Sequence, residues 1–234
     1  MTTITRKPGE FCWINILSPD PDKARDFFAT LLGWEFTEMR GMGHGIKVGG
    51  RNIGGLFNTV SERTPNGMQA VLGVMIKVER ADATVDQIRS LGGKADPAFD
   101  IGPAGRMAVC HDPNGAKFDL WEPKAMHGTD VDSTLHGAPS WCETITSDTE
   151  RAGQFYTTLF GWTPTVSTAS GALCLGWAFS ENFGSLAKRN GRAALRAHVT
   201  AGARALVVFF GQRGVFAWLA APFLLERGSA FLLH

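Results

Sequence analysis

Apolar residues near the start of the chain follow first a strand pattern and then a helical one. Residues 13–17 are rich in aromatic and β-branched side chains and lead into a Ser-Pro-Asp-Pro turn, which is typical of a β-strand. Asp20 then stands at an N-cap position, and Gly33 stands where a helix would end. Between them apolar residues recur at i, i+3, i+4, i+7 and i+8; they are Ala24, Phe27, Phe28, Leu31 and Leu32. This spacing predicts a helix with one apolar face.

The same strand–helix pattern returns 128 residues later. Residues 13–34 align with residues 141–162 without a gap, and eight of the 22 positions are identical. The second helix keeps the apolar face, which consists of Ala152, Phe155, Tyr156, Leu159 and Phe160. A weaker copy at an offset of 60 predicts a strand at 74–78 and a helix at 82–91. Internal repeats of this kind indicate that the chain is built from duplicated units.

Short strand-like runs follow the helices in the first half of the chain. They cover residues 35–39, 45–48, 52–57, 107–110 and 117–121. The last two are joined by a turn, Asp112-Pro113-Asn114-Gly115. The repeating unit is therefore β-α-β-β-β. We expect a domain at 8–124 with modules at about 10–60 and 68–124, a linker at 125–138, the start of a second domain at 139–166, and a different tail at 167–234.

Composition and charge exclude several classes of partner. The chain is 44% hydrophobic with a formal net charge of +1, which gives no general attraction to nucleic acid or to an anionic membrane surface. Its four cysteines are spaced too widely for a disulfide scaffold or a zinc motif. No apolar segment follows the basic residues at the N-terminus, so a cytoplasmic protein with reduced thiols is expected.

The tail departs from this pattern. Residues 166–234 carry seven basic and two acidic side chains, whereas residues 1–165 carry 16 and 20, and the tail contains no second DPxG turn. The apolar stretch Ala205–Leu225 is interrupted by Gln212, Arg213 and Pro222, which makes it a poor membrane span. We interpret the tail as out of frame or otherwise aberrant. The apolar face of the helix near 149–160 would then need the tail or another chain, such as a second copy in a homodimer, to cover it.

Three stretches of the first half carry a family resemblance. They are Trp13 to Trp34, Asn52-Ile53-Gly54-Gly55-Leu56, and Gly105-Arg106 through the Asp112–Gly115 turn to Trp121. Together they resemble the vicinal oxygen chelate superfamily, which includes glyoxalase I, bleomycin-resistance proteins and extradiol dioxygenases. The nearest branch has tandem domains labelled glyoxalase-like or hydroxylase. The resemblance implies an α+β fold in which paired βαβββ modules form an open cupped sheet around a cavity.

In that superfamily the cavity usually holds a divalent metal, but the ligand positions do not carry over to this chain. Alignment from the helix-ending glycines puts Trp13, Gly55 or a neighbour, Gly73 and Asp119 at the four positions, and only Asp119 can bind a cation. Three or four ligands are the norm for a stable site. No metal or other cofactor is therefore expected, unless a non-standard set of residues provides the site.

Strand alternation instead indicates an aromatic-walled cavity face with few polar groups. Its residues are Trp13, Asn15, Met75, Asp119 and Trp121. These residues either bind a small molecule or simply pack between the two modules; the sequence leaves both readings open.

Other polar residues are weaker candidates. His44 in a Gly-rich stretch and His111 before the DPxG turn are expected on the surface. Lys77 and Arg106 either meet an anionic ligand or serve as surface charges, and Glu143 is the counterpart of Asn15 in the third module.

Three functional classes remain open. One is an enzyme of the lyase, isomerase or dioxygenase kind that acts on a small oxygenated or aromatic metabolite. The second is a metal-free protein that sequesters a ligand, as bleomycin-resistance proteins do, and the third is an inactive remnant.

Overall fold

The fold is seen in a computed structural model. It describes residues 6–39, 41, 43–60, 70–129, 131, 135, 137–146, 148–163, 165–167, 173–178 and 205–210.

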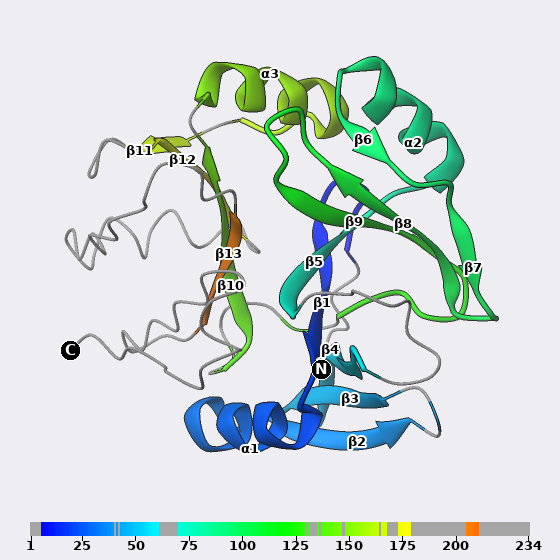
Figure 1. Ribbon diagram of the computed structural model, residues 1–234, viewed down its shortest axis with the longest axis vertical. Helices are drawn as coiled ribbons and strands as arrows, with labels where there is room; N and C mark the ends of the chain where they lie inside the picture. Colours follow the sequence, from blue (N-terminus) through cyan, green and yellow to red (C-terminus); the bar gives the residue numbers. More distant parts are fainter. Residues whose placement is uncertain are drawn as a thin grey trace.

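The described residues between Phe11 and Pro123 form two modules that share one curled, mixed sheet. The first module consists of β1 (Phe11–Ser18), α1 (Pro21–Leu32), β2 (Glu35–Met39), β3 (Gly43–Val48) and β4 (Arg51–Asn58). The second consists of β5 (Val71–Lys77), α2 (Ala81–Ser90), β6 (Lys94–Ala95), β7 (Phe99–Ile101), β8 (Gly105–His111) and β9 (Lys117–Pro123). The strand order is β2-β3-β4-β1-β5-β9-β8-β6, with β7 paired to β8 (Figure 1). This is the predicted α+β architecture of paired modules.

The two modules meet at the antiparallel pair β1–β5. In each module the first strand also pairs in parallel with the last, as β1 with β4 and β5 with β9. Each predicted strand and helix of this half is present within a few residues of its expected bounds, whereas β6 and β7 were not predicted. Both are only two or three residues long, too short to show an alternating pattern.

A third module begins after the predicted linker. It consists of β10 (Pro139–Thr146), α3 (Thr149–Phe160), β11 (Thr165–Ser167) and β12 (Leu173–Ala178), and β13 (Ala205–Phe210) joins its sheet in the order β11-β12-β10-β13. The first six residues of the apolar stretch at 205–225 are thus a strand, and the others lie outside the described residues. No helix in the described part of the chain is long and apolar enough to cross a membrane.

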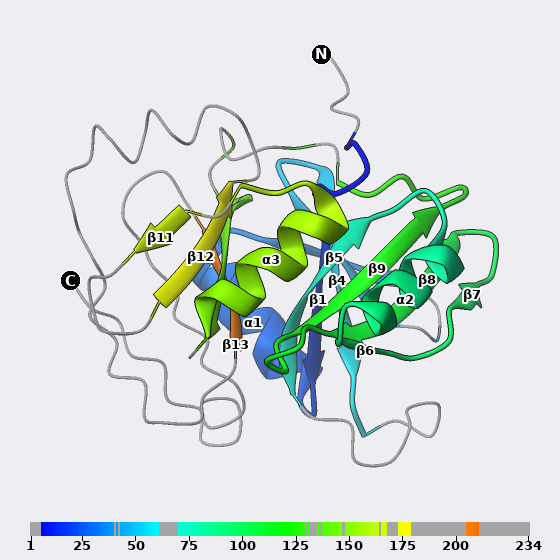
Figure 2. The same ribbon diagram turned by 90° about the horizontal axis from the view of Figure 1, so that it is seen from above.

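The helices α1 and α3 lie between the two sheets, at opposite ends of the interface (Figures 1 and 2). The apolar face of α3 packs on the second module, where Phe118 meets the rings of Phe155, Tyr156 and Phe160 at centroid distances of 5.9–6.2 Å. Phe155 and Tyr156 are therefore buried in the main core. The expectation that the tail or another chain must cover this face is wrong for these two residues, because the first domain covers them.

The segment expected to be a linker packs closely on the sheet. The backbone N–H of Thr129 donates to the carbonyl of Cys12 at 2.7 Å, and Arg6 donates to the carbonyl of Val131. Gly128 has φ +99° and lies so close to Cys12 that a Cβ there would come within 2.7 Å of the Cys12 carbonyl oxygen. The described part of this segment therefore packs against the start of β1, near the middle of the sheet.

Candidate ligand site on the concave face

The five residues predicted for the cavity face do lie on one face of the sheet. Trp13 pairs with Met75 across β1 and β5, and Met75 pairs with Asp119 across β5 and β9. Asn15 and Trp121 lie two residues further along their strands, on the same side as Trp13 and Asp119. The opposite side of these strands faces the main core, where Ile14, Val74 and Leu120 are buried.

The aromatic half of this face is closed. Trp13, Met75 and Trp121 are 9%, 4% and 1% exposed and form a small cluster with Cys12, against which Met107 and Met126 pack. The indole N–H of Trp121 donates to the carbonyl of Met126 at 2.8 Å. These three predicted residues therefore pack against the sheet and the segment that covers it, and they do not form the walls of an open aromatic pocket.

The polar half of the face forms a distinct cluster of Asn15, Lys117 and Asp119, which we call the polar cluster. Lys117 Nζ lies 3.0 Å from Asp119 Oδ1, and the Asn15 side chain lies near the same carboxylate. The Asp119 side chain is only 4% exposed, whereas that of Lys117 is 30% exposed. Burial raises the pKa of Asp119, and Lys117 and Asn15 partly oppose that shift. A buried carboxylate is thus held next to a cation that reaches solvent.

Lys117 is the residue that the sequence reading missed. It precedes Asp119 by two positions on β9, so strand alternation alone would have placed it on the same face.

Glycines border the polar cluster. Asn15 pairs with Gly55 on one side and with Gly73 on the other, so the three residues form one row across β4, β1 and β5. A Cβ on Gly73 would lie 3.6 Å from Asp119 Oδ2 and 3.8 Å from Lys117 Nζ. Asp119 lies in the neighbouring row, because it pairs with Met75, which in turn pairs with Trp13.

The residues present do not fit a divalent metal. Asp119 is the one carboxylate at these positions, two of the others are glycines, and Lys117 already neutralises the carboxylate. Within the described residues there is no group of three or more His, Cys, Asp or Glu side chains that could hold a metal ion. A metal would need at least three such ligands.

His111 lies next to this cluster and is not simply solvent-facing, as was expected. It pairs with Lys117 across β8 and β9, and burial lowers its pKa. His44 belongs to strand β3, and its Nδ1 is buried without a partner among the described residues. The side chain of Glu143, the counterpart of Asn15, lies outside the described residues.

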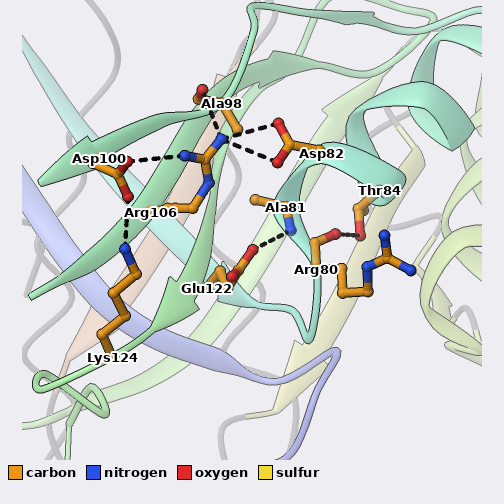
Figure 3. Close-up of polar contacts among 9 residues, drawn as sticks. All are labelled: Arg80, Ala81, Asp82, Thr84, Ala98, Asp100, Arg106, Glu122 and Lys124. Atoms are coloured by element: carbon orange, nitrogen blue, oxygen red, sulfur yellow. Dashed lines mark hydrogen bonds and ion pairs between the residues drawn. The ribbon is translucent and has the colours of Figure 1, made fainter.

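Arg106 is part of a structural network (Figure 3). Its guanidinium donates to both carboxylate oxygens of Asp82 at 3.0 Å and to Asp100, also at 3.0 Å. Asp100 in turn pairs with Lys124 at 2.8 Å. Arg106 therefore connects β8 to the start of α2 and to β7, and its charge is balanced by carboxylates of the protein.

The same network caps α2 from outside the helix. Arg80 at the N-cap provides no side-chain cap, and Glu122 from β9 accepts from the backbone N–H of Ala81 at 2.7 Å instead (Figure 3). Lys77 is also occupied, because its ammonium donates to the carbonyl of Arg6 at 2.6 Å. Arg106 is thus committed to carboxylates of the protein, whereas this one bond to a neutral carbonyl leaves the charge of Lys77 unpaired by it.

A groove of about 330 Å³ lies away from the polar cluster, between the start of α2 and the end of α3. Arg80, Thr84, Leu159 and Phe160 are among the residues that line it. Its lining contains no buried carboxylate, so the concave face is the better candidate for chemistry.

Comparisons with known proteins agree with this fold. Residues 13–121 match the family of glyoxalase-like domains. The chain is 31% identical over 172 residues to the anthracycline biosynthesis protein DauV from Streptomyces sp. strain C5, covering 67% of this chain and 62% of that protein. It is 32% identical over 157 residues to CFP32 from Mycobacterium tuberculosis, provisionally named a glyoxylase, covering 64% and 59%. The chain thus spans about three fifths of the length of these relatives.

Solved structures share the fold at low identity. The homoprotocatechuate 2,3-dioxygenase from Arthrobacter globiformis superposes with a TM-score of 0.50 at 16% identity, over 76% of this chain and 58% of that one. The substrate complex of the Brevibacterium fuscum enzyme gives a TM-score of 0.50 at 14% identity, with the same coverage.

Proposed function

We propose that the chain belongs to the vicinal oxygen chelate superfamily and that its glyoxalase-like domain binds a small oxygenated metabolite at the polar cluster. One observation carries the proposal: the Asp119 carboxylate is almost fully buried on the concave face, where the side chains of Lys117, Asn15 and His111 lie near it. Burying an ionisable group destabilises a fold unless its partners compensate, so such groups are concentrated at functional sites.

The chemistry of the three side chains suits a ligand with adjacent oxygens. Lys117 extends from the buried carboxylate toward solvent and can attract an anionic oxygen, because its side chain is 30% exposed. The Asn15 amide can donate to one ligand oxygen and accept from a hydroxyl. Gly73 presents no side chain on one side of it, and a Cβ there would make only ordinary contacts, whereas the ring of Phe57 fills the space beside Gly55.

If the domain is catalytic, proton transfer by Asp119 is the step that its surroundings support. Burial raises the pKa of this carboxyl toward neutral pH, which suits a group that takes a proton from carbon and returns it. This favours an isomerase or lyase reaction next to a carbonyl group. The polar cluster offers one carboxylate, which is too few ligands for a metal.

The names of relatives support an aromatic, oxygen-rich ligand. DauV is named for anthracycline biosynthesis, and the structural neighbours with a TM-score of 0.50 are named for a catechol-type substrate. These names describe other proteins, so the ligand class is a proposal for this chain.

Ligand-observed NMR with a panel of small hydroxy-, keto- and carboxy-aromatic compounds, including 3,4-dihydroxyphenylacetate, tests the proposal. We expect at least one compound to bind the chain and to lose binding in Asp119→Asn and Lys117→Met variants. Glu38→Gln, on the exposed edge strand β2, is the matched control and should bind as the parent chain does. Binding that survives Asp119→Asn, or no binding by any compound, would contradict the proposal, and the second result would favour an inactive remnant.

A further inference from the structure

An aromatic ring covers one end of the row formed by Gly55, Asn15 and Gly73. A Cβ built on Gly55 would lie 2.6 Å from both Cε2 and Cζ of Phe57, and one built on Gly43 would lie 3.1 Å from its Cδ1. Any side chain at position 55 would therefore displace the ring. Because Gly55 pairs with Asn15, the Phe57 ring lies over the strand next to the polar cluster.

Phe57 stands apart from the packed interior of the domain. Its neighbour Leu56 is buried in the main core on the other side of β4, whereas Phe57 is half-buried on the concave side. Among the described residues, Phe57 belongs neither to the main core nor to the small cluster around Trp121. Part of its ring is therefore accessible to a ligand on the concave face.

The opposite end of the row carries charged groups. A Cβ on Gly73 would lie within 4 Å of both Lys117 Nζ and Asp119 Oδ2, so this ion pair borders the space above Gly73. His111 pairs with Lys117 on the neighbouring strand. Burial and the neighbouring lysines lower the pKa of His111, while Asp96 and Asp119 oppose that shift. The His111 imidazole is thus close enough to respond to a further charge placed beside Lys117.

The space between the Phe57 ring and the Lys117 ammonium matches the size of one ring with an acidic substituent. The ring lies over β4 and the ammonium lies over β5, with β1 between them. Neighbouring strands are about 4.8 Å apart, so the two groups are separated by about 10 Å along the row. An aromatic ring that packs on Phe57 at a centroid distance of about 5 Å brings its substituent within reach of Lys117.

We infer that Phe57 gives the proposed site a preference for planar aromatic ligands, whose ring packs on Phe57 while an acidic oxygen faces Lys117. An aryl α-keto acid is the simplest ligand of this class, since its adjacent oxygens can meet Asn15 and Lys117 together. The inference rests on the proposed function and deepens it. The polar cluster holds the oxygens, and Phe57 determines which hydrocarbon group is accepted.

Two ligands that differ only in the ring test this inference. Phenylglyoxylate and cyclohexylglyoxylate carry the same keto and carboxylate groups, but only the first is aromatic. Their dissociation constants are measured by NMR titration of the parent chain and of Phe57→Leu and Gly55→Ala. Phe57→Leu removes the aromatic surface and keeps an apolar side chain, whereas Gly55→Ala keeps Phe57 and displaces its ring. Phe99→Leu, at a 46% exposed position on β7, is the matched control.

We expect the parent chain and Phe99→Leu to bind phenylglyoxylate about two- to tenfold more tightly than cyclohexylglyoxylate, which is the contribution of one aromatic pair. Phe57→Leu and Gly55→Ala should bind the two compounds with nearly equal affinity. The carboxylate of either compound should also raise the pKa of His111, followed by its imidazole resonances, in the parent chain and in Phe57→Leu alike. A merely structural role of Phe57 would weaken both compounds equally and leave their ratio unchanged.

An unchanged ratio in Phe57→Leu and Gly55→Ala, or equal affinities in the parent chain, would overturn this inference while the proposed site stands. If Asp119→Asn binds both compounds as the parent chain does, the proposed site is wrong, and the role of Phe57 beside it is wrong too. Binding of neither compound would overturn both proposals.

Discussion

Phe27 and Phe155 allow the contribution of one interface to be measured by a matched pair of substitutions. They occupy the same position in α1 and α3, and each packs edge-on to the next aromatic residue, at 5.1 Å from Phe28 and 5.0 Å from Tyr156. Only Phe155 is covered by the second module. Changing each to Ala alters helix propensity equally, so the difference between the two variants reports the covering module.

The expected magnitudes follow from burial. Phe155 is 3% exposed, and a fully buried Phe→Ala change costs about 3–5 kcal/mol because a cavity remains. Phe27 is 37% exposed, so its change loses about two thirds of the transfer free energy of one Phe side chain, about 1–2 kcal/mol, and leaves no closed cavity. We therefore expect the Phe155→Ala variant to be less stable than the Phe27→Ala variant by about 2 kcal/mol.

Urea unfolding followed by Trp fluorescence measures both variants against the parent chain. For a chain of this size each kcal/mol should lower the melting temperature by about 2–4 °C, which provides a second readout. Equal losses of stability in the two variants would refute the reasoning, because they would mean that the second module does not cover α3 in solution.

Three further outcomes follow from the buried and ion-paired groups. Burial raises the pKa of Cys12 and of Cys110 to about 12, so neither thiol should react with iodoacetamide at pH 8 until the chain is unfolded; mass spectrometry of the labelled protein checks this. Because the pKa of Asp119 is raised, the native state holds this proton more tightly than the unfolded chain does. The contribution of Asp119 to the free energy of unfolding is therefore largest at low pH and falls as the pH rises through the native pKa. Urea unfolding from pH 3 to pH 7 should show a smaller fall in the free energy of unfolding for Asp119→Asn than for the parent chain. Arg106→Lys removes the contact that one guanidinium nitrogen makes with both oxygens of Asp82 and should lower the urea midpoint. No change in the midpoint would show that the network contributes nothing to stability.

The sequence was informative where local chemistry decides the structure. The caps at Asp20 and Gly33, the helical spacing between them and the repeat at 128 residues predicted α1, α3 and their common geometry. Strand alternation also placed Trp13, Asn15 and Asp119 on one face, because the side-chain period of a strand is two and needs no tertiary information.

Features that depend on contacts distant in sequence could not be predicted. Whether Trp121 lines a pocket or a packed cluster depends on Met126, which belongs to a segment whose polar composition suggested a loose linker. Which residues meet across the strands also depends on the backbone register, which puts Asn15 level with Gly73 and puts Trp13 level with Met75 and Asp119. The origin of the tail also stays a prediction; resequencing the gene around codon 166 tests it, and a verified stop with this tail as expressed protein would contradict it.

The location of the ligand site can be tested directly by amide chemical-shift mapping of the isotope-labelled chain, titrated with the compound that binds best in the panel. We expect the largest amide shifts at Asn15, Gly73 and Asp119, and we expect these shifts to disappear in the Asp119→Asn variant. Shifts confined to the groove lined by Arg80 and Leu159, with the concave face unchanged, would contradict it.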